Sequence, residues 1–147
     1  MPKIYIPVAV QRAILELSKD YCEYCILPSN FSTDFFHYEH IIPLTLDGET
    51  KLENLARSCG MCNNNKSDRI KYTDSLTKQI VRLYHPRQDI WFEHFQWSSD
   101  DLHIVGITAI GRATIELLKL NRINAVNLRK LLKKADLHPP FFVIKPR

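Results

Sequence analysis

Two Cys-x-x-Cys pairs constrain the fold of this chain more than any other feature of its sequence. The first pair is Cys22 and Cys25, and the second is Cys59 and Cys62. Each pair puts two thiols on one tight turn, and two such turns supply the four ligands of a tetrahedral zinc site. We therefore expect these four cysteines to hold a structural, unreactive zinc ion that staples the two turns together.

No cysteine lies outside the two pairs. The amino-terminal stretch lacks the apolar run and small-residue cleavage site of a signal peptide. We therefore expect a cytoplasmic location, where metal thiolates are favoured over disulfides. Lys66 and Arg57 are expected to lie near the thiolates and to offset their charge. A redox or disulfide protein that uses the same pairs stays as a weaker alternative.

The length of 147 residues and the hydrophobic content of 45% predict a single globular domain, residues 1–147. No apolar run reaches 18 residues, so we expect no membrane association. The charge is uneven, because residues 112–147 hold nine of the 20 Lys and Arg residues but two of the 16 Asp and Glu residues. This basic end is typical of a partner that is a polyanion, such as nucleic acid, and equally of a solvated helix face.

The segment between the cysteine pairs is longer than the roughly 15–20 residues of a simple zinc ribbon. Within it, Phe35 to Ile42 is rich in aromatic and β-branched residues and predicts a strand. Alternation along a strand puts His37 and Glu39 on one face and His40 on the other. We expect an antiparallel return strand at residues 55–58 and a helix from residue 66 to residue 72.

Apolar periodicity and turn residues predict the remaining elements. We expect helices over residues 10–21, 74–83 and 108–120, the last capped by Thr108, and a hairpin of residues 91–97 and 102–107. A final helix capped by Asn124 is expected to bury one set of side chains and to expose another. The buried set is Leu128, Leu131, Leu132 and Ala135, and the exposed set is Arg129, Lys130, Lys133 and Lys134.

Three segments carry a resemblance to a known family, namely Tyr38–Pro43, Asn54–Leu55 and Cys62–Lys66. With both cysteine pairs they resemble the HNH endonucleases, also called His-Me finger or ββα-metal nucleases, over residues 22–69. The resemblance implies an α+β fold with a small zinc-stabilised ββα-metal module at about residues 20–72. Flanking helices and a carboxy-terminal hairpin with a basic helical extension, at about residues 84–138, complete the expected organisation.

The resemblance also implies roles for four residues. His40 corresponds to the general base that activates water for attack on phosphorus. Glu39 and Asn63 correspond to the protein ligands of one catalytic divalent ion, Mg²⁺ or Mn²⁺. Asn54 corresponds to the asparagine that bonds loop backbone and fixes how His40 is presented. Glu39 replaces the commoner Asp of the motif, and Asn63 replaces a His.

The implied activity is metal-dependent hydrolysis of DNA phosphodiester bonds, with double-stranded DNA as the expected partner. Lys66 and Arg69 are expected to contact phosphates. His37 is a further candidate for the phosphate or the metal, and a packed histidine explains it equally well. The alternative to an enzyme is a zinc-stabilised nucleic-acid-binding protein whose nuclease site is inactive.

Overall fold

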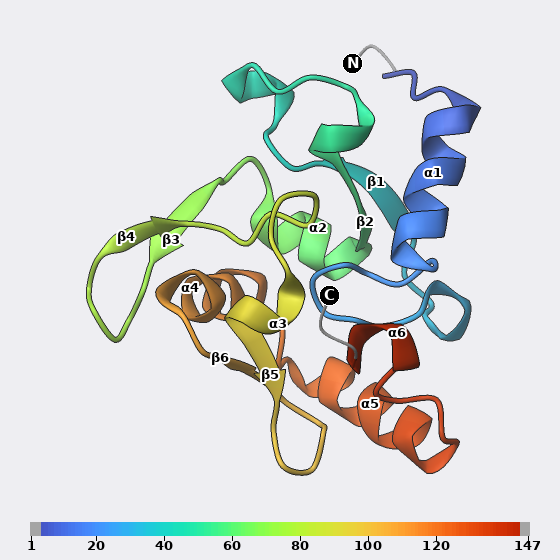
Figure 1. Cartoon of the computed structure of the whole chain (residues 1–147), viewed down its shortest axis with the longest axis vertical. Helices are drawn as coiled ribbons and strands as arrows, with labels where there is room; N and C mark the ends of the chain where they lie inside the picture. The colour runs from blue at the N-terminus through green and yellow to red at the C-terminus, as the bar shows by residue number, and fades with distance from the viewer. Residues whose placement is uncertain (1–3, 145–147) are drawn as a thin grey trace.

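The computed structural model describes residues 4–144 and confirms an α+β fold, with small antiparallel sheets and helices around them (Figure 1). The helices are α1 (Val8–Ser18), α2 (Gly60–Lys66), α3 (Trp91–His94), α4 (Ala109–Leu118), α5 (Ile123–Lys134) and α6 (Phe141–Ile144). The strands are β1 (Phe36–His40), β2 (Leu55–Cys59), β3 (Lys71–Thr73), β4 (Ile80–Arg82), β5 (Phe95–Trp97) and β6 (Ile104–Gly106). Across residues 4–144, no helix combines the length and apolar character needed to cross a membrane.

The expected ββα unit is present in β1, β2 and α2. β1 pairs antiparallel with β2, so that Phe36 faces Cys59 and His40 faces Leu55. α2 begins directly after β2, and its first turn is capped by the Cys59 sulfur, which accepts a hydrogen bond from the Cys62 N–H. Figure 1 shows α2 between the β1–β2 hairpin and α4, and α2 contacts both.

Two predicted helices are wrong, because residues 71–73 and 80–82 pair as the β3–β4 hairpin. α2 ends at Lys66, where Ser67 has a positive φ of 53° that breaks the helix. Asp74 closes the hairpin turn by accepting hydrogen bonds from the backbone N–H and the hydroxyl of Thr77. The same carboxylate accepts two bonds from Arg112 of α4, at 2.9 and 3.0 Å. Such side-chain bonds give this backbone an alternative to the helix.

The expected hairpin of residues 91–97 and 102–107 forms only in part. β5 pairs with β6, while Trp91–His94 is the short helix α3. Trp91 and Phe95 pack with ring centroids 5.0 Å apart in the hydrophobic core. The predicted cap of α4 is confirmed, since the Thr108 hydroxyl accepts a bond from the Gly111 N–H at 3.0 Å.

The burial predicted for the last helix, α5, is partly wrong. Its amino-terminal cap is Arg122 instead of Asn124. Leu131 is 65% exposed and Ala135 is also exposed, whereas Arg129 is fully buried. Arg129 lies on the buried face of α5 because its guanidinium donates to buried backbone carbonyls and lies over the Trp97 ring. The other predictions hold: Leu132 is buried, Leu128 is partly buried, and Lys130, Lys133 and Lys134 are exposed.

Candidate metal centre and active site

The four cysteines converge on one point. Their Sγ atoms all lie within 4.8 Å of one another, and all four side chains are buried. The Cys25 and Cys59 sulfurs are 3.8 Å apart. A zinc ion with Zn–S bonds of about 2.3 Å requires tetrahedron edges of about 3.8 Å. The four buried cysteines are therefore placed to hold a metal ion such as zinc.

Backbone N–H groups support each cysteine turn. The Cys25 N–H donates to the Cys22 sulfur at 3.5 Å, and the Cys62 N–H donates to the Cys59 sulfur at 3.4 Å. Ile26 follows the first turn with a positive φ of 59°. Because these donors point at sulfur, they stabilise the thiolate form that binds metal.

A cation from the far end of the sequence covers the thiols. One terminal nitrogen of Arg122 lies 3.6 Å from the Cys62 sulfur. The other lies 3.7 Å from the Cys25 sulfur and 3.4 Å from the Cys59 sulfur. Burial alone would lower the pKa of Arg122, but the charges of these thiolates raise it above its ordinary value. Arg122 is thus held in its charged form against the cysteine centre.

Lys66 and Arg57 do not have the role expected for them beside the thiolates. Arg57 pairs with Asp20 at 2.9 Å and lies over the Tyr38 ring. Lys66 is 1% exposed, and its ammonium lies 2.6 Å from the Glu39 carboxylate. Both cations have carboxylate partners of their own, so Arg122 takes the place that the sequence suggested for them.

Glu39 is buried, and both of its carboxylate oxygens are engaged. Oε1 pairs with Lys66, and Oε2 accepts a hydrogen bond from the Tyr24 hydroxyl at 2.8 Å. Lys66 also donates to the Ile41 carbonyl at 2.9 Å. Burial raises the pKa of Glu39, while Lys66 and Tyr24 act in the opposite direction. A phosphate contact by Lys66 requires this ion pair to open.

His40 lies at the end of β1 with one ring nitrogen engaged. Its Nε2 lies 2.8 Å from the Thr50 hydroxyl. Burial lowers the pKa of His40, and the nearby charge of Lys66 lowers it further. A histidine with a lowered pKa gives up its proton at a lower pH. The His40 imidazole is therefore neutral at pH 7 and able to accept a proton.

Asn54 clamps the loop between β1 and β2. Its side-chain oxygen accepts from the Ile42 N–H at 2.8 Å, and its amide donates to the carbonyls of Ile42 and Glu49. Ile42 lies two residues after His40, and Glu49 directly precedes Thr50. Asn54 therefore fixes the two backbone segments whose side chains meet in the His40–Thr50 contact.

The path of this loop also depends on Gly48. A Cβ atom at Gly48 would lie 1.8 Å from the Ile42 carbonyl oxygen, which no side chain tolerates. Asp47, the preceding residue, adopts the left-handed conformation with a φ of 63°. The pair Asp47–Gly48 thus permits a close return of the loop onto Ile42.

The remaining predicted site residues lie at different places. Asn63 is partly buried on α2, three residues before Lys66, and residues three apart share a helix face. His37 is exposed on β1, and Arg69 is exposed after the end of α2. The structure therefore pairs Glu39 with Lys66 and joins His40 to the loop that Asn54 clamps, with Asn63 on the helix that carries Lys66. Phosphate contacts by Lys66, Arg69 and His37 stay predictions.

Tyr24, Thr50 and Arg122 are site residues that the sequence analysis missed. Tyr24 lies inside the first cysteine pair, and this position is the only local signal for it. Thr50 lies in a polar loop without periodicity. Arg122 lies 97 positions after Cys25, so no spacing pattern connects the two.

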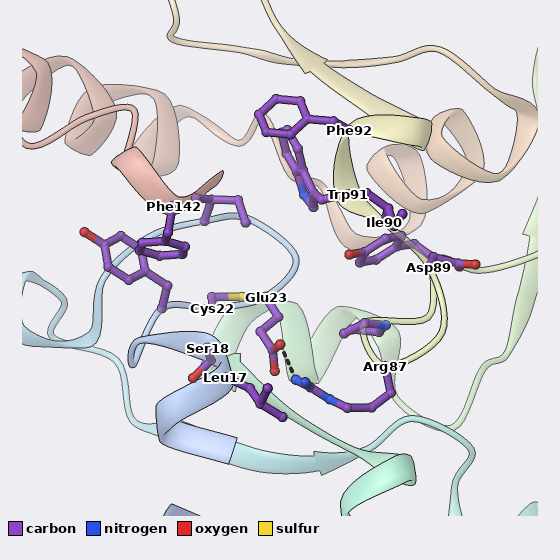
Figure 2. A pocket seen from close by; sticks show the side chains of 14 residues that line it. Leu17, Ser18, Cys22, Glu23, Arg87, Asp89, Ile90, Trp91, Phe92 and Phe142 are labelled. Atoms are coloured by element: carbon purple, nitrogen blue, oxygen red, sulfur yellow. Dashed lines mark hydrogen bonds and ion pairs between the residues drawn. The ribbon is translucent and has the colours of Figure 1, made fainter. Parts of the chain in front are cut away.

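One pocket borders the cysteine centre, and another borders the Glu39 ion pair. One, of about 130 Å³, lies between the first cysteine pair, the end of α1 and α3. Figure 2 shows the ion pair of Glu23 and Arg87 on one side of it and Trp91 on the other. None of the four predicted catalytic residues lines it. A second pocket, of about 210 Å³, is lined by Ile41 and Lys66 and so borders the Glu39 ion pair.

Comparison with known proteins agrees with this geometry. The family model described as HNH endonuclease matches residues 22–69. Neither the curated proteins nor the solved structures contain a significant match to the chain. The family match implies a nucleic acid substrate and supports a nuclease-type or nucleic-acid-binding role. Residues 22–69, with their four converging cysteines, are thus similar to the HNH endonuclease domain.

Proposed function

We propose that this protein is a metal-dependent HNH endonuclease that hydrolyses phosphodiester bonds of double-stranded DNA. One observation carries the proposal: the His40 ring is held by Thr50, and Asn54 clamps the backbone on both sides of this contact. A positioned, neutral imidazole suits general-base hydrolysis better than binding alone.

His40 acts as the base. In the tautomer in which Nε2 carries the proton and donates to the Thr50 hydroxyl, Nδ1 has the lone pair that accepts a proton. Nδ1 then takes a proton from the water that attacks phosphorus. Asn54 and Thr50 keep the imidazole in this orientation. This positioning matters because a misplaced base loses most of its effect.

Glu39 and Asn63 are the residues that would hold the catalytic ion, Mg²⁺ or Mn²⁺. A carboxylate and an amide oxygen suit such hard ions. When bound, the ion supplies positive charge that stabilises the phosphate and the leaving oxygen. Cys22, Cys25, Cys59 and Cys62 would hold zinc with a structural role. The cytoplasmic location stays a prediction.

A nucleic-acid-binding protein with an inactive site is the second candidate. The ion pair of Lys66 with Glu39 favours it, because this pair occupies a carboxylate oxygen that a metal ion needs. The two candidates differ in one outcome, since a binder shifts DNA in a gel but does not cut it.

A plasmid assay tests the proposal. The zinc-loaded full chain is incubated with supercoiled plasmid and Mg²⁺ or Mn²⁺, beside His40→Ala purified in the same way. We expect conversion to nicked or linear DNA by the native chain only, with both proteins binding DNA equally. Equal cleavage by His40→Ala would remove His40 as the base. DNA binding without cleavage under any metal condition would favour the second candidate.

A further inference from the structure

Two arginines from the carboxy-terminal third lie against the cysteine centre. Arg122 places its two terminal nitrogens over the sulfurs of Cys25, Cys59 and Cys62. Arg129, in the second turn of α5, is fully buried and donates to the Cys25 carbonyl at 3.0 Å. Both residues belong to the basic end of the chain, outside the segment that matches the family model.

The charge of the centre explains why a cation is needed there. A divalent ion bound by four thiolates keeps a net charge of minus two. The Sγ atoms of the centre are buried, and a buried charge without a partner is costly. Arg122 is the described cation that contacts three of the sulfurs, and it keeps its charge throughout the physiological pH range.

A simpler role for Arg122 would be to close the turn between α4 and α5, since it also donates to the Lys119 carbonyl at 3.3 Å. That bond uses one nitrogen and does not require the second nitrogen to contact Cys25 and Cys59. Arg129 adds a further constraint, because it fixes α5 to the first cysteine turn through Cys25 and to Leu120 through a bond of 2.7 Å. The start of α5, where Arg122 lies, is thereby held over the sulfurs.

We propose that Arg122 is a working part of the metal centre, which offsets the negative charge of the metal-bound thiolates and makes metal retention depend on the carboxy-terminal helices. Hydrogen bonds to metal ligands typically change metal affinity by about 10- to 100-fold. This role is independent of the proposed nuclease activity, because it concerns only the four cysteines and the ion that they hold.

The proposal also changes how the basic end is interpreted. Four of its nine cations have partners within the protein: Arg112 with Asp74, Arg122 with the thiols, Arg129 with carbonyls, and Lys133 with Asp101. Lys119, Lys130 and Lys134 are exposed, and Lys145 and Arg147 lie outside the described residues. Part of the positive charge thus serves the fold, and does not predict a DNA-binding tail.

A zinc competition titration of the full chain tests the proposal. Arg122→Met is compared with Arg122→Lys, which keeps the charge, and with Lys119→Met, which removes a nearby exposed charge. Zinc affinity is measured against a chromophoric chelator. We expect a loss of about 10- to 100-fold for Arg122→Met, a smaller loss for Arg122→Lys, and the native affinity for Lys119→Met.

Cobalt substitution separates a contact with sulfur from general destabilisation. The sulfur-to-cobalt charge-transfer band reports on the thiolates directly, so it is expected to shift in Arg122→Met and to stay unchanged in Lys119→Met. If Arg122→Met does not fold, Arg122→Lys and Arg122→Gln are compared, and the charge role requires that Lys retains more zinc affinity than Gln. Native zinc affinity with an unchanged cobalt band in Arg122→Met, or Gln equal to Lys, would overturn the proposal.

Discussion

The cysteine centre and the Glu39 site both hold a cation beside side chains that could bind a metal ion, but they place that cation differently. Arg122 contacts three sulfurs from one side, and the four ligand atoms still converge within 4.8 Å. Lys66 instead lies 2.6 Å from a carboxylate oxygen of Glu39, where a metal ion would bind. The first site is already arranged for its ion, whereas the second is closed by an internal ion pair.

This difference is what the proposed structural and catalytic metal sites would require. An ion in the cysteine centre forms part of the core, so its binding contributes directly to folding. An ion at Glu39 must compete with the ammonium of Lys66, and the carboxylate charge is already offset. We therefore expect tight, permanent binding at the cysteines and weak, exchangeable binding at Glu39.

The largest expected effect is loss of the fold in Cys59→Ser. Apparent binding energies of structural zinc reach about 10–16 kcal/mol, which equals or exceeds the roughly 5–15 kcal/mol stability of a domain. The variant is expected to lose zinc and its cooperative melting transition in circular dichroism. Met61→Ser, an exposed change two residues along the chain in α2, is the matched control. A native melting curve for Cys59→Ser would contradict the proposed structural ion.

His40→Ala is expected to affect the Glu39–His40 site and to leave the cysteine centre unchanged. Loss of a general base lowers the cleavage rate by about 10²- to 10⁴-fold, while zinc content and melting temperature stay native. Because the pKa of His40 is lowered by burial and by Lys66, the proposed cleavage activity of the native chain should fall only below about pH 6.5, where the imidazole becomes protonated. The pH–rate profile checks this, and an acidic limb above that pH would argue against His40 as the base.

Lys66→Met tests whether the ion pair closes the Glu39 site. Removing one partner of a buried pair typically costs about 3–5 kcal/mol, so the zinc-loaded variant without Mn²⁺ should be less stable in urea than the native chain. At the same time Glu39 loses its competitor, so Mn²⁺ should bind at lower concentration, as measured by electron paramagnetic resonance. Arg69→Met, an exposed change just after α2, is the control. Weaker Mn²⁺ binding in Lys66→Met would mean that Lys66 supports the ion.

The sequence predicted those features that depend on residues close together in the chain. The cysteine turns and the β1–β2 hairpin follow from spacing and residue type over short distances, whereas the loop contacts of Asn54 are implied only by the resemblance to the HNH endonucleases. The helix expected at residues 74–83 failed because the Asp74 side chain organises a turn and is held there by Arg112, 38 positions away. No window of sequence contains both partners.

Cations were the residues whose places were predicted worst. Amphipathic periodicity assigns Arg129 to solvent, yet its guanidinium bonds buried carbonyls at Cys25 and Leu120. Lys66 was expected beside the thiolates, yet it is buried with Glu39. A long cationic side chain can lie in the core whenever acceptors surround it, and the acceptors come from distant segments. Sequence periodicity records the polarity of a residue but not its partners.

The smallest expected effect concerns Thr50, which separates positioning from chemistry at the Glu39 site. Thr50→Val keeps the shape of the side chain but removes the bond to His40 Nε2, so the imidazole loses its preferred tautomer. One lost hydrogen bond is worth about 0.5–1.5 kcal/mol, which corresponds to a fall in kcat of up to about tenfold. Thr50→Ser keeps the hydroxyl and should retain activity, and Thr45→Val, an exposed change in the same loop, should have no effect.

Nitrogen-15 chemical shifts of the His40 ring give a readout that does not depend on cleavage. In the native chain and in Thr50→Ser we expect the proton on Nε2, and in Thr50→Val a mixture of the two tautomers. If His40 keeps a single tautomer without the hydroxyl, then Thr50 does not position it. The loop clamped by Asn54, which bonds Ile42 and Glu49, would in that case orient the imidazole through the backbone alone.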